Sequence, residues 1–352
     1  MEPIPDRMRA VCLTGHGGPE ALSFRTDFPV PKPVRGEVLI RVHAAGVNDT
    51  DINTRVGWYS KRDNDAADSG WTGKALQFPR IQGADVCGEI VAVGTGVPHS
   101  RIGERVLVEP SLREACGRML EQPWYFGSEV DGGFAEFTVV ASRHAHAVRS
   151  PLSSVELGSF PCSYSTAENM LTRASVCEGD RVLVTGASGG VGSAAVQLAK
   201  ARGAHVIAAT SSSKAAALSE IGADETVARD ADSLKALGEN CVDVVIDLVA
   251  GPDWPLMLDV LRPGGRYAVS GAIAGPMVTL DVRTLYLKDL SLFGCTVLDP
   301  DVFPNLMDHI EASRIAPLVA RVFPLEEIGA AQEAFEAKAH IGKIVLAVNE
   351  ET

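Results

Sequence analysis

The stretch of residues 181–214 constrains the fold more than any other part of the chain. It reads RVLVTGASGGVGSAAVQLAKARGAHVIAATSSSK, in which an apolar run, a glycine-dense turn, an alanine-rich segment and a second apolar run follow one another. We predict a strand over residues 181–185, a helix over residues 193–201 and a strand over residues 205–209, which together form a βαβ unit. The stretch therefore indicates a parallel sheet with helical crossovers.

The turn of this unit has the composition of a nucleotide-binding loop. Gly189 and Gly190 would let the backbone approach a pyrophosphate, and Gly192 would let the helix pack closely against the strand. Free amides at the start of the helix, which we expect near Gly192, would face the anion. The predicted cofactor contacts in this loop are Ala187, Ser188, Gly189, Gly190, Val191 and Gly192. The alternative is a structural turn without a ligand.

The residues after the second predicted strand indicate which nucleotide is bound. Chains that bind NAD usually place Asp or Glu there, about 20 residues after the glycines, whereas this chain has no acid before Glu220. Hydroxyl groups and an ammonium would bind a 2′-phosphate through charge-assisted hydrogen bonds. We therefore predict NADPH (NADP) as the cofactor, held by Thr210, Ser211, Ser212 and Lys214.

Two alternatives remain open for this phosphate site. The serine run is also compatible with a solvated turn that caps the next helix. Arg229 is a candidate second cation at the phosphate, although a solvated loop arginine explains its position equally well.

The composition limits the partners. The 352-residue chain has a formal net charge of −13, which argues against nucleic acid or an anionic membrane, since both need a clustered basic face. No apolar stretch approaches the length that spans a bilayer, and the start, MEPIPDRMRAVCL, lacks the apolar region of a signal peptide. Seven scattered cysteines without CxxC spacing indicate reduced thiols. We expect a cytoplasmic protein that acts on a small molecule.

The length and the pattern of segments predict two domains. Up to about residue 150, short strand-like runs alternate with Gly and Pro turns, which is typical of a small barrel or sandwich. From residue 151, helix-like and strand-like segments alternate, which predicts a doubly wound parallel sheet. From about residue 295 we expect the chain to return to the first domain. The predicted domains are residues 153–295 for nucleotide binding, and residues 1–152 completed by residues 296–352.

Several segments resemble the medium-chain dehydrogenase/reductase superfamily and, within it, the zinc-free quinone oxidoreductase (zeta-crystallin-like) branch. They are AAGVNDTDINTRVGWY at 44–59, IQGADVCGEIVAVG at 81–94, DGGFAEF at 131–137, TGASGGVGSAAVQLAK at 185–200 and HIGKIVL at 340–346. The resemblance runs over essentially the whole chain. It implies an α/β fold made of a Rossmann domain and a GroES-like β-rich catalytic domain, with a substrate cleft between them.

The resemblance bears directly on metal binding. Zinc alcohol dehydrogenases of the superfamily have Cys where this chain has Asn48, and His-Glu where it has Ala84 and Asp85. Only Cys162 falls where the third zinc ligand would sit, and one ligand does not hold zinc. The structural zinc of these relatives uses four cysteines, where this chain has only Cys116. We therefore predict no metal, Cys162 as a packed core thiol, and Asp85 as a structural acid.

What remains is hydride transfer without a Lewis acid. Quinones and α,β-unsaturated carbonyls can accept hydride with help from hydrogen-bond donors alone, whereas alcohol oxidation loses its main electrophile without zinc. Asn48 and Tyr59 coincide with the active-site Asn and Tyr of the branch. The resemblance implies that Tyr59 donates a hydrogen bond or proton to the oxyanion and that Asn48 orients substrate or nicotinamide. Ser270, Gly271 and Ala272 are expected to line the nicotinamide.

Some alternatives stay open. Tyr59 would also fit an apolar wall with its hydroxyl in water, and the function would also fit an alcohol or aldehyde dehydrogenase or a non-catalytic, NADPH-binding or structural protein. The loop of residues 60–79 and the segment 109–129 depart from the shortest members of the branch, which leaves the substrate open because loops set pocket shape. An apolar strand pair near residues 290–297 is compatible with a homodimer, as in the family.

Overall fold

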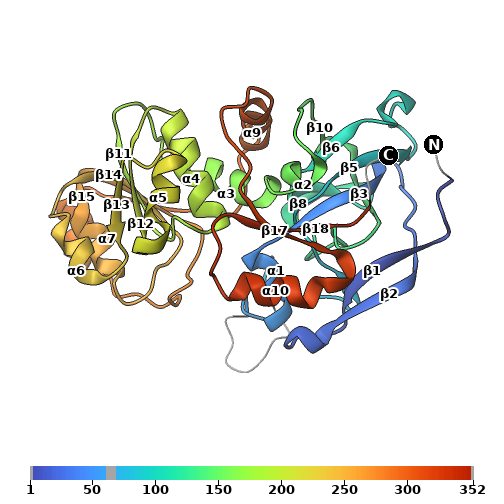
Figure 1. Ribbon diagram of the computed structural model, residues 1–352, viewed down its shortest axis with the longest axis horizontal. Helices are drawn as coiled ribbons and strands as arrows, with labels where there is room; N and C mark the ends of the chain where they lie inside the picture. Colours follow the sequence, from blue (N-terminus) through green and yellow to red (C-terminus); the bar gives the residue numbers. More distant parts are fainter. Residues whose placement is uncertain (1–2, 61–68, 350–352) are drawn as a thin grey trace. The chain divides into compact units, whose positions relative to one another are not determined.

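The computed structural model describes residues 3–60 and 69–349 of the chain (Figure 1). Contacts within it define two compact units. Unit 1 comprises Met1–Cys162, Pro317–Ala339 and Lys343–Thr352, and unit 2 comprises Ser163–Ala316 and His340–Gly342. Among the described residues, no helix is both long and apolar enough to cross a membrane.

Unit 2 is built on a six-stranded sheet with the order β13-β12-β11-β14-β15-β16, and every neighbouring pair is parallel. This is the doubly wound order, in which the two halves diverge from β11 and β14. The predicted Rossmann-type fold is therefore confirmed. The strands are β11 (Arg181–Val184), β12 (His205–Thr210), β13 (Glu225–Ala228), β14 (Val242–Asp247), β15 (Leu261–Val269) and β16 (Ser291–Gly294).

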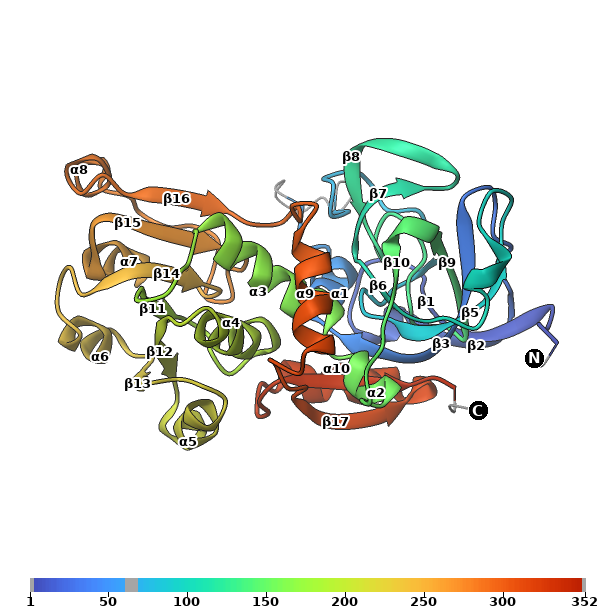
Figure 2. The same ribbon diagram turned by 90° about the horizontal axis from the view of Figure 1, so that it is seen from above.

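Helices cover both faces of this sheet. Figure 2 shows α4 and α7 on opposite sides of it, and the α7 side chains Trp254, Met257 and Leu258 pack on sheet residues such as Leu183 and Val245. Burial on both faces explains why most residues of β11 and β14 are valine, leucine or isoleucine. The helices are α3 (Pro161–Arg173), α4 (Gly190–Ala201), α5 (Ser212–Glu220), α6 (Ala231–Ala236), α7 (Trp254–Val260), α8 (Val282–Leu287) and α9 (Val302–Glu311).

Unit 1 is β-rich. A seven-stranded sheet has the order β10-β6-β5-β3-β18-β17, with β9 also paired to β3, and β2-β1-β4 and β7-β8 form smaller sheets. Its strands are β1 (Arg7–Leu13), β2 (Leu22–Pro29), β3 (Glu37–Val47), β4 (Arg80–Ile81), β5 (Cys87–Val93), β6 (Arg105–Val108), β7 (Ser111–Ala115), β8 (Arg118–Tyr125), β9 (Phe137–Ala141), β10 (Ala145–Ala147), β17 (Val319–Pro324) and β18 (Lys343–Ala347). Its helices are α1 (Asp49–Val56), α2 (Ser154–Leu157) and α10 (Ile328–Glu336).

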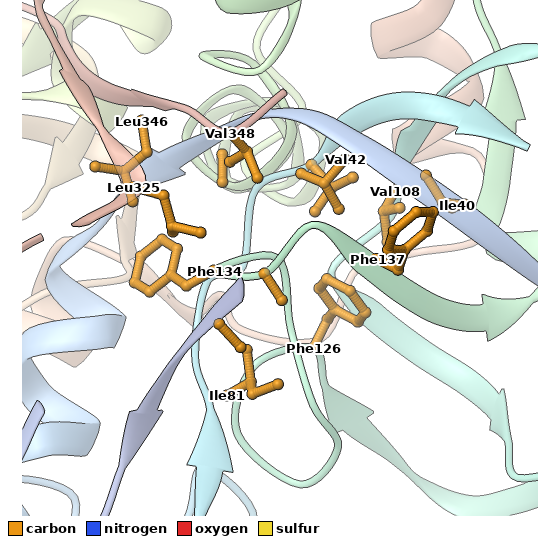
Figure 3. Packing of buried hydrophobic residues seen from close by; sticks show 14 of the residues in the cluster. Ile40, Val42, Ile81, Val108, Phe126, Phe134, Phe137, Leu325, Leu346 and Val348 are labelled. Carbon is orange, nitrogen blue, oxygen red and sulfur yellow. The ribbon is translucent and has the colours of Figure 1, made fainter. Parts of the chain in front are cut away.

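The last part of the chain completes the core of unit 1. Leu325, Leu346 and Val348 belong to the same buried cluster as Ile40 and Val42 of β3 (Figure 3). β18 pairs antiparallel with β3, so a strand near the end of the chain lies between β3 and β17 in the seven-stranded sheet. Unit 1 thus includes Pro317–Ala339 and Lys343–Thr352.

The division into units differs from the predicted boundaries after residues 152 and 295. The chain leaves unit 1 only after Cys162, because α2 packs on β3 and the Cys162 N–H donates to Asp85. It stays in unit 2 through Ala316, whose carbonyl accepts a hydrogen bond from the Tyr164 hydroxyl at 2.9 Å and whose N–H donates to Gln197 at 2.8 Å. Both shifts depend on side-chain contacts that leave no change in composition along the sequence.

Candidate functional site

The loop after β11 presents backbone amides at the carboxyl end of the parallel sheet. Helix α4 begins at Gly190, earlier than the predicted residue 193, with Gly189 as its N-cap and no capping side chain among the described residues. The N–H of Ser193 is the first that bonds back along the helix, to the Gly189 carbonyl at 2.9 Å. The amides of residues 190–192 therefore remain for an anion, as at other helix N-termini.

The close packing predicted for Gly192 is present. A Cβ atom added there would lie 2.2 Å from the Gly186 carbonyl oxygen and 2.7 Å from the Ala187 Cα atom. Neither backbone atom can move without displacing the turn, so only glycine fits. At Gly189 an added Cβ would meet only the Gly186 oxygen, at 3.6 Å, so steric packing does not require glycine there.

The residues predicted to bind the 2′-phosphate follow two neighbouring strands. Thr210 ends β12, and it pairs with Ala228 of β13, so Ser211 and Arg229 emerge side by side at the carboxyl edge of the sheet. The Thr210 side chain is buried, and its Oγ1 atom has no hydrogen-bond partner among the described residues. The edge therefore brings Ser211 and Arg229 together, whereas the Thr210 hydroxyl is enclosed by the protein.

Two further contacts refine this site. Ser211 is the N-cap residue of α5, but its side chain forms no capping hydrogen bond. The alternative that the serines cap this helix therefore agrees with the position of Ser211 but not with its contacts. Lys214 Nζ donates to the His340 carbonyl at 2.7 Å, and the Gly342 N–H donates to the Ser188 carbonyl at 3.2 Å. The short segment His340–Gly342 thus lies against both the predicted phosphate lysine and the glycine-rich turn.

The predicted nicotinamide segment lies at the same edge. Ser270, Gly271 and Ala272 follow β15, and the Ser270 N–H donates to the Asp247 carbonyl at 3.3 Å. The buried Asp247 carboxylate accepts hydrogen bonds from Thr185 Oγ1 and the Tyr267 hydroxyl, which joins the ends of β11, β14 and β15. All the predicted cofactor residues therefore gather at the carboxyl ends of the strands, where doubly wound folds bind ligands.

In unit 1, a buried polar cluster forms where β3 ends and α1 begins. Asn48 precedes α1, and its N–H donates to Asp51 Oδ2 at 2.8 Å. The other Asp51 oxygen accepts from the Gly83 N–H at 3.2 Å. Because Asp51 is enclosed, desolvation raises its pKa to about 7 in spite of these hydrogen bonds.

The side chain of Asn48 is held by protein groups. Its Nδ2 atom donates to Asp85 Oδ2 at 2.8 Å and to the Gly46 carbonyl at 3.3 Å, and its Oδ1 atom accepts from Lys343. Asn48 is only 5% exposed. The predicted role of orienting substrate or nicotinamide thus finds no support in these contacts, which instead fix the amide within the cluster.

Asp85 and Lys343 form a buried ion pair at the centre of the cluster. Lys343 Nζ lies 2.8 Å from Asp85 Oδ2, and both side chains are almost fully buried. Asp85 Oδ1 accepts from the Cys162 N–H in the first turn of α3, where the helix dipole favours a carboxylate. A Cβ atom on Gly46 would lie 2.4 Å from Asp85 Oδ2, so the backbone of β3 leaves room for this carboxylate. Asp85 is structural, as the sequence suggested.

An apolar wall adjoins the cluster. Ala84, Tyr125 and Cys162 form one buried group with Trp71 packed against it. The Tyr125 hydroxyl and Cys162 Sγ lie 3.0 Å apart, and the Trp71 and Tyr125 rings are stacked with centroids 5.1 Å apart. Desolvation, together with the Asp85 charge, raises the pKa of Cys162 to about 12. It is therefore a thiol and not a thiolate at neutral pH.

Tyr59 lies close behind α1. Its hydroxyl donates to Thr50 Oγ1 at 3.1 Å, and its ring meets Trp58 edge to face, with centroids 5.5 Å apart. Desolvation raises the pKa of Tyr59 above its usual value, so the phenol is protonated and can donate a hydrogen bond. In the structure this hydrogen bond goes to Thr50, and the role of Tyr59 as a donor to a substrate stays a prediction.

The two segments that depart from short relatives contact each other. Residues 61–68 of the loop 60–79 lie outside the described residues. In its described part, the Trp71 N–H donates to Ser128 Oγ at 3.2 Å and the Thr72 N–H to Glu129 Oε1 at 2.9 Å. The loop and the segment 109–129 therefore support one another and carry the stacked pair of Trp71 and Tyr125.

The donor set does not match a catalytic zinc. Zinc needs at least three protein ligands of thiolate, imidazole or carboxylate type, whereas Asn48, Ala84 and Cys162 supply an amide, a methyl group and a single sulfur. Nowhere in the described part of the chain do three or more His, Cys, Asp or Glu side chains form a group that could hold a metal ion. Glu109, His144 and His146 meet, but His144 Nε2 already accepts two backbone N–H groups.

Several residues of the site were missed from the sequence. The spacing of Asn48 and Asp51 is that of a capping box, which could have indicated Asp51. Lys343 is a charged residue at the start of an otherwise apolar strand, which could have indicated a buried partner. Thr50 lies in the first turn of α1, and it could have been proposed as a partner once Tyr59 was assigned to the site. Tyr125 has no local signal, because only the fold brings it to Cys162.

Comparison with known proteins agrees with these units. The family model of the alcohol dehydrogenase GroES-like domain matches residues 34–150, which confirms the predicted GroES-like domain, and that of the zinc-binding dehydrogenases matches residues 190–312. The human quinone oxidoreductase is 30% identical over 96% of this chain and 97% of its own length. The acryloyl-coenzyme A reductase of Metallosphaera sedula is 31% identical over 96% of this chain and 99% of its own.

A solved structure is more similar still. It is a protein of Sinorhizobium meliloti 1021, provisionally named an alcohol dehydrogenase, that is 47% identical with a TM-score of 0.91 over 98% of each chain. Together with the fold and the site, these likenesses define an oxidoreductase. The chain belongs to the medium-chain dehydrogenase/reductase superfamily, in its quinone oxidoreductase branch.

The pKa of Asp51 gives a testable pH dependence. Folded Asp51 keeps its proton up to about pH 7, whereas the unfolded chain loses it near pH 4. The folded state therefore binds more protons in this window, and the free energy of unfolding falls as pH rises, by up to about 1.4 kcal/mol per pH unit.

We expect Asp51→Asn to lack this slope in urea titrations from pH 4 to 7.5. Asp49→Asn, at an exposed position of the same helix, should keep it. An unchanged slope in Asp51→Asn contradicts the assignment.

Proposed function

We propose that this chain is an NADPH-dependent oxidoreductase that transfers hydride to a quinone or an α,β-unsaturated carbonyl without a catalytic zinc. The observation that carries the proposal is the donor set of Asn48, Ala84 and Cys162, in which only the thiol is a ligand type that zinc uses and the Asn48 amide donates to Asp85. A site without a Lewis acid favours acceptors that are already electron-poor.

The residues of unit 2 support NADPH as the cofactor. The amides of residues 190–192 would bind the pyrophosphate, and Thr210, Ser211, Ser212, Lys214 and Arg229 would surround the 2′-phosphate. The strand end has no carboxylate that would repel this phosphate. When bound, NADPH supplies the hydride.

Tyr59 is the proposed acid of the reaction. Negative charge develops on the acceptor oxygen as hydride arrives, and a neutral phenol would stabilise it by a hydrogen bond or proton. The Tyr59 hydroxyl donates to Thr50 Oγ1 at 3.1 Å, so the phenol O–H would turn from Thr50 to the acceptor oxygen when it gives up its proton. Asn48 would act through its neighbours and not on the substrate.

The alternatives remain distinct. The relative from Sinorhizobium meliloti favours an alcohol or aldehyde dehydrogenase, because its provisional name is that of an alcohol dehydrogenase. A non-catalytic, NADPH-binding role would leave the same fold without turnover. We also propose a cytoplasmic location, supported by the cysteines, none of which forms a disulfide within the described part of the chain.

A screen of acceptors tests the proposal. Purified protein is incubated with NADPH or NADH and a panel of quinones, enones, enoyl thioesters, aldehydes and ketones, and cofactor oxidation is followed by absorbance. We expect NADPH-dependent turnover with a member of the first three classes. Turnover confined to aldehydes and ketones would favour the dehydrogenase, and none with any acceptor would favour a binding role.

The phosphate site predicts a cofactor-selective effect. Lys214→Ala should weaken NADPH binding by roughly tenfold to a hundredfold, about 1.5–3 kcal/mol for a lost hydrogen bond to a charged group, with little effect on NADH. Fluorescence titration measures both dissociation constants. Lys200→Ala, which removes an exposed lysine paired with Asp224, is the control. An equal loss for both cofactors would refute the phosphate role.

The proposed acid predicts a kinetic effect. Tyr59→Phe should lower kcat for an enone by about a hundredfold with little change in KM, because the hydrogen bond strengthens only in the transition state. The exposed Tyr286→Phe is the control. If steady-state assays show the same kcat for Tyr59→Phe and the wild type, the phenol is not the acid.

We further propose a homodimer through unit 2. Strand β16 is an edge of the six-stranded sheet, and exposed apolar side chains gather in the sequence around it: Ile273, Met277, Val278, Leu280, Val282, Tyr286, Leu287, Leu292 and Val297. An uncovered edge with such a surface favours pairing with a second copy.

Sedimentation velocity tests this dimer. Leu292→Lys should shift the protein from dimer to monomer, because a charge would enter the apolar contact. The control Met119→Lys, at a residue of β8 that is 62% exposed, should stay dimeric. A wild type that sediments as a monomer would overturn the proposal.

A further inference from the structure

Asp247 is a buried carboxylate at the carboxyl end of β14, and the proposed function gives it no role. The residue is 1% exposed. Its Oδ1 atom accepts from Thr185 Oγ1 and from the Val249 N–H at 2.9 Å, and its Oδ2 atom accepts from the Tyr267 hydroxyl. The Ala250 N–H donates to both oxygens, at 3.2 and 3.3 Å. All of these partners are neutral, so none of them balances the charge of the carboxylate.

The two hydroxyl groups are oriented as donors to Asp247. Trp254 Nε1 donates to the Tyr267 oxygen at 2.8 Å, and the Leu248 N–H donates to Thr185 Oγ1 at 3.0 Å. Each hydroxyl oxygen thus already accepts one hydrogen bond, and its own O–H is left for the carboxylate. Because hydrogen-bond donors favour the charged form of a carboxyl group, Asp247 is held as an anion.

This anion lies between the two segments of unit 2 that are predicted to bind the cofactor. Thr185 directly precedes the glycine-rich turn. On the other side, the Ser270 N–H donates to the Asp247 carbonyl at 3.3 Å. A Cβ atom on Gly271 would lie 2.8 Å from the Leu248 carbonyl oxygen, so the predicted nicotinamide segment packs directly against the residue that follows Asp247. A dinucleotide bound at the carboxyl ends of the strands would cross this edge.

Hydride transfer changes the charge of the cofactor at this edge. Two electrons and a hydrogen nucleus pass to the acceptor, whose oxygen takes a proton from the proposed acid Tyr59, and a positive charge is left on the nicotinamide of NADP⁺. A fixed anion attracts this cation more strongly inside a protein than in water, because the interaction is less screened there. The neutral ring of NADPH has no such attraction. A nearby anion therefore favours the oxidised cofactor.

We propose that Asp247 is a buried charge that stabilises NADP⁺ relative to NADPH and so favours reduction of the acceptor over the reverse reaction. This inference rests on the proposed function and adds a direction to it. The donors around the carboxylate hold it in place before the cofactor binds, so its attraction requires no rearrangement of the protein. If Asp247 only joined the ends of β11, β14 and β15, it would affect both forms of the cofactor alike.

The test compares the affinities for the two forms of the cofactor. Asp247→Asn removes the charge but keeps an oxygen for Thr185 and for the backbone N–H groups. The dissociation constants of NADP⁺ and NADPH are measured with the whole chain by isothermal titration calorimetry. Tyr267→Phe is the structural control, because it removes a donor and keeps the carboxylate. Asp253→Asn, at the exposed N-cap of α7, is the charge control, because water and salt screen an exposed charge.

We expect Asp247→Asn to weaken the binding of NADP⁺ by about tenfold relative to that of NADPH, so the ratio of the two dissociation constants rises by this factor. Tyr267→Phe should keep the wild-type ratio even where it lowers thermal stability, and Asp253→Asn should match the wild type. The wild type itself should bind NADP⁺ at least as tightly as NADPH.

Other outcomes overturn the inference. An unchanged ratio in Asp247→Asn, including equal weakening of both forms, means that Asp247 serves the fold alone. If this variant does not fold, the double variant Asp247→Asn/Tyr267→Phe, which also removes the phenol that faces the substituted side chain, is measured in its place. A wild type that binds NADPH more than about tenfold more tightly than NADP⁺ contradicts the inference without any variant.

Failure of the proposed function is a separate result. Binding is measured without an acceptor, so the ratio can be read even if the wild type turns over no quinone, enone or enoyl thioester. If the chain prefers NAD, the same ratio is measured with NAD⁺ and NADH, because the charge of the ring changes in the same way.

Discussion

The buried pair of Asp85 and Lys343 is the interaction on which unit 1 depends. Charges removed from water are tolerated only when they are paired and fully hydrogen-bonded, and here each polar atom of the pair has a partner. This requirement accounts for neighbouring residues that look unrelated in sequence. Gly46 leaves room for the carboxylate, Asn48 bonds both charges, and Cys162 contributes its N–H and not a thiolate. The cluster therefore fixes the backbone around the proposed acid.

Unit 2 depends on a different constraint, the close packing of β11, the glycine-rich turn and α4. The same turn leaves backbone amides available at the start of α4. Local composition encodes this unit, because β-branched runs favour strands, alanines favour helices and glycines permit the tight turn between them. The doubly wound parallel sheet was therefore predictable from residues 181–270. Helix α4 begins earlier than predicted because Gly190 already belongs to the helix. The glycine-dense turn gave no sign of this in the sequence.

The candidate site in unit 1 was predictable only in part. Tyr59 and Asn48 were found through resemblance, but the partners of Asn48 were not, because Lys343 and Asp85 are far apart in sequence and meet only after β18 pairs with β3. The same holds for Tyr125 and Cys162. The unit boundaries differ from the predicted ones for the same reason. Gln197 and Asp85 bond to residues distant in sequence, and the composition of those segments does not reveal these contacts.

The proposed chemistry needs a site that works without a catalytic metal. Its most direct test is the metal content of the purified active protein, measured by plasma mass spectrometry and combined with enone turnover before and after dialysis against a chelator. We expect zinc far below one ion per chain and turnover that the chelator does not change. One zinc ion per chain, whose removal abolishes turnover and whose return restores it, would contradict a metal-free site.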